Sequence, residues 1–303
     1  MLPRDRLPFS PITERPPLTL PDGARLVLWP VLALEEWDIS RPMARTVIPP
    51  PQGPPLIPDV ANWSWHEYGM RVGFWRLHRM FRRLGVSPTV TINAKICESY
   101  PQVVTACLES SWELTAHGYE HIPMHRIENQ PEVIQQAMDL ITKFAGYRPR
   151  GWWGPGLAHT YDTLDYLAAA GIEYIGDWVL DDEPVALRTT STPVVALPYN
   201  FEIHDLVLMF QGQSSDAVFR RAMDQFECLY EESAERPKVM AMACHAYLSG
   251  SPHRIRHVER TLETIMRRKG VVVWNGSAIL DWYREQTSMT TTRCNEASPQ
   301  TAE

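Results

Sequence analysis

The chain alternates short apolar runs with segments of helical periodicity, and this alternation constrains its fold more than any other feature. The first run, "ARLVLWPVLAL" at residues 24–34, is apolar almost throughout, which is typical of a strand buried on both faces. Further apolar runs centre near residues 90, 114, 174, 195, 240 and 272. Segments with helical spacing separate most of them, and one ends on Gly85, a residue that favours a helix C-cap. Helices and about seven strands that take turns predict a parallel sheet or a β/α barrel.

The length and composition favour one large domain. With 303 residues and 44% apolar content, the chain can bury a sizeable core, and we expect a single β/α-barrel domain at residues 24–285. An irregular segment at residues 1–23 precedes it. The proline-rich stretch at residues 42–58 cannot form a helix or an inner strand and predicts a long loop. The polar residues 286–303 predict a disordered tail.

Charge and cysteine usage exclude several classes of protein. A net charge of -7 leaves no basic stripe for nucleic acid, and no stretch reaches the roughly 18 apolar residues of a membrane span. Five scattered cysteines without a CxxC pair predict neither a disulfide framework nor a zinc ribbon, and they favour a reducing compartment. Because charges and prolines fill the first 20 residues, where a signal peptide would be apolar, we expect a cytoplasmic protein.

Polar and aromatic side chains gather where the predicted strands end, and the carboxyl ends of parallel strands converge on one edge. These residues are Glu35, Glu36, His117, His121, Trp152, Trp153, Asp177, Tyr199 and His245. Imidazole and carboxylate groups at one edge could hold a cation and move protons, as metal-assisted or acid–base hydrolysis requires. Each residue also has an ordinary structural explanation: solvated carboxylates for the glutamates, a satisfied core histidine for His245 and a rigid turn for "GWWGPG".

Several segments, in order, resemble motifs of the polysaccharide deacetylase superfamily with the NodB-type fold. The resemblance is strongest to the branch that contains metal-independent allantoinases and cyclic-imide hydrolases. It runs from about residue 24 to 283, and the segments that carry it are "ALEEWD", "YGMRVGFWRL", "AHGYEH", "GWWGPG", "GDWVLDDEP", "LPYNFEIHD" and "CHAYLSGSPHR". The resemblance implies a distorted seven-stranded β/α barrel. It also implies hydrolysis of a non-peptide C–N bond, in an N-acetyl group for the sugar enzymes and in a ring amide or imide for this branch.

The resemblance also implies roles for individual residues. His117 and His121 match the two metal histidines, and Glu35 matches the metal carboxylate, with Glu36 as the alternative after a one-residue slip. His245 matches the late catalytic histidine, which protonates the leaving nitrogen or stabilises charge on the carbonyl oxygen. Tyr199 lies in the segment whose backbone helps to bind that oxygen.

Three departures from the family pattern bear on these roles. The general base aspartate of sugar deacetylases would fall near Ala33 or Leu34, so that base is absent or Glu36 replaces it. Trp153 stands where many relatives have arginine, which removes a fixed cation. His121, which the metal-independent allantoinases lack, is kept and favours a metal site.

These observations together predict a hydrolase of a small cyclic amide or imide that uses one divalent metal, with zinc preferred. Glu35, His117 and His121 would bind the metal, Glu36 would act as the base and His245 as the acid. The residues expected to contact the substrate are Trp65, Trp152, Trp153, Asp177 and Tyr199. The alternatives are a metal-free site, a glycan deacetylase and a non-catalytic ligand-binding homologue. Exposed aromatic and proline residues are compatible with a homo-oligomer.

Overall fold

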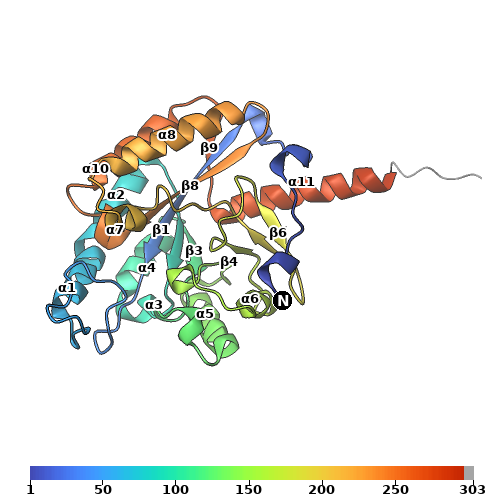
Figure 1. The fold of residues 1–303 in the computed structure, drawn as a ribbon. Coiled ribbons are helices and arrows are strands. Elements are labelled where there is room, and N and C mark those ends of the chain that lie inside the picture. Colours follow the sequence, from blue (N-terminus) through green and yellow to red (C-terminus); the bar gives the residue numbers. More distant parts are fainter. Residues whose placement is uncertain (297–303) are drawn as a thin grey trace, which may run out of the picture.

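A computed structural model gives the structure of residues 1–296, with the surroundings of side chains described to residue 287. Figure 1 shows a curled sheet with helices around it, and a last helix that projects from the body of the molecule. This architecture confirms the predicted α/β fold, in which helices alternate with the strands of a curled sheet.

The sheet has nine strands in the order β6-β7-β5-β4-β3-β2-β1-β8, and β9 also pairs with β1. All of these pairs are parallel except β6 with β7. The strands are β1 Leu26–Leu34, β2 Thr89–Ile92, β3 Glu113–Ala116, β4 Gly151–Trp152, β5 Tyr174–Ile175, β6 Val185–Leu187, β7 Val194–Ala196, β8 Lys238–His245 and β9 Val271–Val273. Seven of them match the apolar runs in the sequence, whereas β4 and β6 are too short to leave an apolar run of their own.

The sheet curls into a barrel, so that its first strand, β6, approaches its last, β8. Two hydrogen bonds connect these two edges. Val239 N of β8 donates to Asp182 O at 3.0 Å, and Asn200 Nδ2 donates to Ala241 O at 2.8 Å. Because nearly all strands are parallel, their carboxyl ends lie at one end of this barrel.

The helices are α1 Val60–Tyr68, α2 Phe74–Leu84, α3 Ile96–Ser99, α4 Pro101–Glu109, α5 Gln130–Ala145, α6 Thr163–Ala169, α7 Asp205–Phe210, α8 Ala217–Glu232, α9 Ala246–Ser249, α10 Ile255–Met266 and α11 Gly276–Glu296. A π-helical turn, Gly69–Gly73, joins α1 to α2. Gly85 ends α2 in the left-handed conformation with φ 67°, as its place after the helical run predicts. Among the described residues, no helix combines the length and the apolar character that crossing a bilayer requires.

In the structure α11 continues to Glu296, and so includes the first part of the stretch from residue 286 for which the sequence predicts a disordered tail (Figure 1). The start of α11 is anchored by Ile279 and Leu280, which are fully buried, and by Trp282, which is nearly so. Once such a turn is fixed, each further residue of a helix adds a hydrogen bond at little cost. Residues 297–303 of the predicted tail lie outside the described residues.

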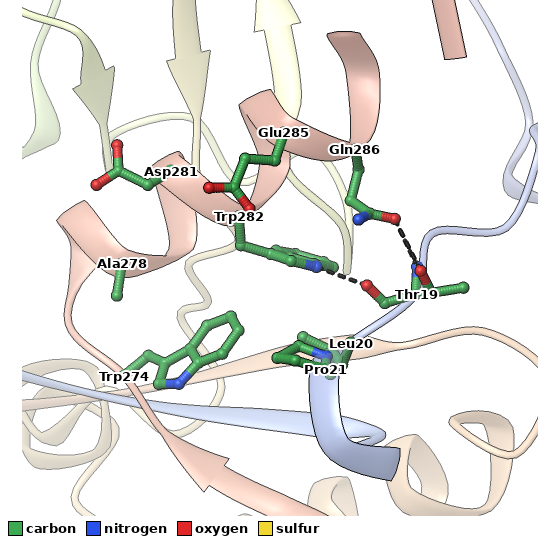
Figure 2. Close-up of a pocket in the computed structure, with 9 residues that line it drawn as sticks. All are labelled: Thr19, Leu20, Pro21, Trp274, Ala278, Asp281, Trp282, Glu285 and Gln286. Carbon is green, nitrogen blue, oxygen red and sulfur yellow. Dashed lines mark hydrogen bonds between the residues drawn. The ribbon is translucent and has the colours of Figure 1, made fainter. Parts of the chain in front are cut away.

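The N-terminal segment packs against α11 around a cavity of about 370 Å³. Figure 2 shows Trp282 Nε1 donating to Thr19 O, at 2.7 Å, and Gln286 contacting Thr19 beside it. None of the site residues predicted from the sequence lines this cavity. A second cavity of about 1290 Å³ lies between the N-terminal segment and residues 179–186, and Tyr199 is the predicted site residue in its wall.

Candidate active site

Strand alternation decides which residues at the strand ends face the barrel interior. Along β1, Leu28 and Leu32 pack in the core between sheet and helices, whereas Val27, Trp29 and Val31 belong to the cluster inside the barrel. Successive side chains point to opposite faces, so Glu35 continues the inward series and Glu36 the outward one. The same alternation places His117 after β3 and His245 at the end of β8 on the inside. Glu35, His117 and His245 therefore meet at one end of the barrel. His121 joins them from the loop that follows His117.

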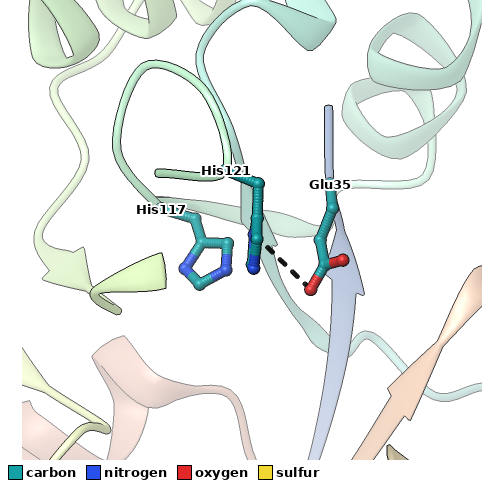
Figure 3. A group of neighbouring side chains, drawn as sticks. All are labelled: Glu35, His117 and His121. Atoms are coloured by element: carbon teal, nitrogen blue, oxygen red, sulfur yellow. Dashed lines mark ion pairs between the residues drawn. The ribbon is translucent and has the colours of Figure 1, made fainter. Parts of the chain in front are cut away.

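Glu35, His117 and His121 form a group that could hold a metal ion, with ligand atoms all within 4.8 Å of one another. Figure 3 shows the carboxylate of Glu35 facing His121, and Oε1 lies 3.6 Å from His121 Nδ1. His117 Nδ1 lies 2.8 Å from the carbonyl oxygen of Trp153. If Nδ1 carries the proton, this contact fixes the ring and leaves Nε2 free to coordinate, which is the usual support of a metal-binding histidine.

The polar atoms of this group fit a metal. Glu35 Oε1 and His121 Nδ1 are both buried and have no hydrogen-bond partner. Burial lowers the pKa of His117 and His121, which favours the neutral imidazole that binds metals. Burial alone would raise the pKa of Glu35, but Arg45, His121 and His245 outweigh it and hold that pKa well below its ordinary value. The donor set is therefore an anionic oxygen and two neutral nitrogens, which suits zinc and similar divalent ions.

His245 lies opposite this group and is held by Asp205. Its Nδ1 is 2.7 Å from Asp205 Oδ1, while Asp205 Oδ2 accepts from the backbone N of His245 and from Ser249 Oγ. His245 Nε2 is turned toward Glu35 Oε1, at 3.4 Å. Burial alone would lower the pKa of His245, but Asp205 and Glu35 raise it to about 9. The imidazole is therefore protonated at neutral pH and can donate a proton from Nε2.

His204 adds a second buried imidazole to this side of the site. Its ring centre lies 5.1 Å from that of His245, and together with Asp205 these histidines form a second possible ligand group among the described residues. Burial and the neighbouring His245 lower the pKa of His204 to about 4, so it is neutral near pH 7.

The structure does not place the Glu36 carboxyl with the histidines, which corrects its predicted role as the base. The groups that act on this carboxyl are Ser99, Lys95, Glu67 and Glu120, which lie outside the barrel interior. Alternation explains the difference, because the side chain next to an inward one points outward. Burial raises the pKa of Glu36 to about 7.

The Glu36→Gln variant is expected to be more stable than the wild type at pH 8 by about 1.5 kcal/mol, a figure reduced for solvent screening of this half-buried group. In the folded protein the pKa is raised from 4.5 to about 7, so between these values the unfolded chain loses the proton while the folded chain keeps it. The wild type therefore loses stability as pH rises through this window, and the glutamine variant does not. Urea unfolding at pH 5 and pH 8 measures the difference. The exposed Glu98→Gln is the control, and an equal effect of Glu36→Gln at both pH values contradicts the burial argument.

The two tryptophans of "GWWGPG" point in opposite directions. Trp152 is fully buried in the core between sheet and helices, so it has no access to substrate and its predicted contact with substrate is corrected. Trp153 faces the interior, with its ring centre 5.6 Å from that of Trp29 and 6.1 Å from that of Tyr199. A Cβ on Gly176 would lie 2.1 Å from the Trp153 ring, so only glycine there leaves room for this tryptophan. Trp153 and Tyr199 thus pack against one another inside the barrel, where Tyr199 also lies beside His204.

Asp177 supports the turn that carries Trp153. Its Oδ1 accepts from Gly154 N at 2.8 Å, and its Oδ2 lies 2.5 Å from His159 Nε2. Both carboxylate oxygens therefore have protein partners, so the predicted contact of Asp177 with substrate would have to displace one of them.

An aromatic cover lies on the other side of Glu35. Trp65 is half-buried, and its ring centre lies 4.8 Å from that of Tyr247 and 6.2 Å from that of Trp37. Met43, from the proline-rich loop, joins the same cluster. Of the predicted aromatic contacts, Trp65 is the one that lies toward solvent.

Four residues that contact the site were not identified from the sequence: Trp37, Arg45, Asp205 and Tyr247. Trp37 Nε1 and Tyr247 Oη both donate to Glu35 Oε2, at 2.9 and 3.1 Å. Asp205 closes the segment "LPYNFEIHD" and could have been found as a carboxylate after a strand end. Arg45 carries no such signal, because it lies inside a loop whose path no local pattern predicts.

Comparison with known proteins gives a consistent result. The sequence profile of the polysaccharide deacetylase family matches residues 66–175. A Schizosaccharomyces pombe protein provisionally named a polysaccharide deacetylase is 28% identical over 237 residues, which are 69% of this chain and 72% of that protein.

Two solved structures share the fold. A Pseudomonas aeruginosa protein, also provisionally named a polysaccharide deacetylase, has a TM-score of 0.80 at 27% identity, over 92% of this chain and 99% of that one. A Puue allantoinase has a TM-score of 0.80 at 24% identity, over 92% and 98% of the two chains, and this likeness concerns the fold alone.

Proposed function

We propose that this chain, which belongs to the polysaccharide deacetylase superfamily, hydrolyses a non-peptide C–N bond in a small cyclic amide or imide. Deacetylases of this superfamily cleave such a bond, so the reaction class follows from the family. The cyclic substrate and the metal are the further steps of the proposal.

One observation carries the proposal. Glu35 Oε1 and His121 Nδ1 are buried atoms without hydrogen-bond partners, and they face one another across 3.6 Å. A buried polar atom that accepts no hydrogen bond is costly, and such atoms often mark the place of a ligand. Together with His117 they supply three protein ligands, the number that leaves a position open for water in catalytic zinc sites.

The residues of this chain then have distinct tasks. Glu35, His117 and His121 would hold one divalent ion, zinc by preference, which supplies an activated water and polarises a carbonyl when bound. His245 directs a protonated Nε2 toward the same place and would donate that proton to the departing nitrogen. Asp205 keeps the ring in this orientation and keeps it protonated. Neutral His204 offers a further hydrogen-bonding group beside His245.

The enclosure of the site supports a small substrate. The side chains of Glu35, His121 and His245 are at most 6% exposed. Trp37, Trp65 and Tyr247 form an aromatic cluster beside them, and Trp153 is buried inside the barrel. An enclosed site with aromatic neighbours favours a small, flat substrate, whereas a polysaccharide needs an open groove.

Deacetylation of an amino sugar is the second candidate, and the family profile and the names of the relatives favour it. It uses the same ligands and the same proton donor, and differs only in the group that the aromatic cover must admit.

A substrate panel separates the candidates. Zinc-loaded protein is tested on five- and six-membered cyclic imides and ureides and on N-acetylated sugars and chito-oligosaccharides, with His121→Ala as the control. We expect ring opening of at least one cyclic substrate by the wild type only. Release of acetate from the sugars alone would support deacetylation, and turnover of neither class, despite bound metal, would favour a ligand-binding homologue.

A further inference from the structure

The proline-rich loop places a fixed positive charge on the candidate metal carboxylate. Arg45 NH1 lies 2.5 Å from Glu35 Oε2 and 3.0 Å from Tyr247 Oη. Its side chain is 9% exposed, so this contact is screened little by solvent. Burial alone would lower the pKa of Arg45, but Glu35 and Tyr247 raise it, and the guanidinium stays charged.

The loop holds Arg45 in this position through α1. Asn62 Oδ1 accepts from the backbone N of Val47 and of Ile48, and Asn62 Nδ2 donates to Ile48 O and to Asp59 Oδ2. Asn62 and Asp59 are themselves buried. The backbone two residues after Arg45 is therefore clamped, and the arginine is a built part of the site.

The two oxygens of Glu35 have different surroundings. Oε2 accepts from Trp37 and Tyr247 besides Arg45, whereas Oε1 has no partner and faces His121 and His245. Two neutral donors would hold Oε2 in place even without the arginine. The distinct contribution of Arg45 is thus its positive charge. This charge already balances the negative charge of Glu35, which would otherwise attract a metal ion.

We propose that Arg45 sets the metal affinity of the Glu35, His117 and His121 group by repelling the cation, so that the ion is held less tightly than by the same ligands without the arginine. This inference rests on the proposed function, because it assumes that the group binds a metal. The guanidinium at Oε2 and a metal ion at Oε1 would carry like charges on one buried carboxylate. Their repulsion corresponds to a decrease in metal affinity of about tenfold or more. The loop thereby makes the metal exchangeable and controls how much of the protein is loaded at a given metal concentration.

The test is the affinity of the metal-stripped full-length protein for Zn²⁺ alone, measured by competition with a chromophoric chelator at pH 7. Arg45→Gln keeps an N–H donor and removes the charge, and we expect it to bind zinc at least about tenfold more tightly. Arg45→Lys keeps the charge and should stay within about threefold of the wild type. Arg41→Gln is the matched control, because Arg41 lies near the same loop, is 53% exposed and pairs with Asp38 and Glu120 instead.

The outcomes separate this inference from the proposed function. If the wild type binds zinc through His121 and Arg45→Gln binds it equally or more weakly, the repulsion is overturned and the metal site stands. If neither protein binds zinc, both ideas fail. If zinc binds only to Arg45→Gln, the repulsion stands, whereas the proposed metal-assisted function of the wild type fails. Thermal melting of each variant without metal verifies that it is folded, and Arg45→Met, which also removes the charge, takes the place of Arg45→Gln if that variant does not fold.

Discussion

Protein with His121→Ala is expected to retain no stoichiometric metal and to lose hydrolysis by more than about a hundredfold. Mutation of a residue that supports a metal ligand typically lowers metal affinity or activity ten- to a hundredfold, and we expect loss of a ligand itself to lower them further. The alanine also leaves Glu35 and His117 as the remaining two of the three ligands. Elemental analysis of untagged protein, loaded with zinc and desalted, measures the metal.

The control for this prediction is His125→Ala. His125 lies four residues farther along, in the turn Met124–Arg126, and is exposed. It should keep about one ion per chain and full activity. If His121→Ala retained the ion, the ligand role of His121 would be refuted, and if the wild type held no metal, the metal-free alternative would gain support.

The Asp205→Asn variant is expected to lower kcat at pH 8 by about a hundredfold or more, the range typical of a general acid. Asp205 is a main cause of the raised pKa of His245, which is about 9. Without that charge the pKa falls toward its ordinary value, so His245 is no longer protonated at pH 8. The alkaline limb of the kcat profile should therefore move from about pH 9 toward neutrality.

The pH profile is the measurement that distinguishes this role from a structural one. A merely destabilised site would lose activity at all pH values, whereas loss of the proton-holding charge leaves partial activity near pH 6. Asp216→Asn is the control, because this exposed carboxylate pairs with Arg220 at the start of α8. An alkaline limb that stays in place would mean that Asp205 does not govern the acid.

The sequence predicted the fold well because its signals are local. The strands β1 and β8 are long and apolar, and α5 and α8 have clear helical spacing, so each could be read from its own residues. β4 and β6, with two and three residues, were not predicted, because so short a strand is defined only by its pairing with neighbouring strands. The length of α11 could not be read locally either, because its later residues are polar and its buried anchor lies earlier, at Ile279 and Leu280.

The candidate site was predicted in part. Glu35, His117, His121 and His245 come together as expected, because strand ends in a parallel sheet converge. Their roles as ligands and acid remain predictions. Glu36 and Trp152 were assigned to the site from their position alone, and the structure turns both side chains outward.

The sequence by itself determined the alternating architecture, the strand ends and the residue types that gather there, because periodicity and strand endings are properties of neighbouring residues. Only the tertiary structure decided which of two adjacent side chains faces the barrel, because that depends on how each strand is oriented in the curled sheet. It also joined Asp205 to His245 across 40 positions of the chain and Arg45 to Tyr247 across 202. Contacts at such separations leave no local pattern, yet they place the charges that determine the protonation of His245 and, by our proposal, the metal affinity.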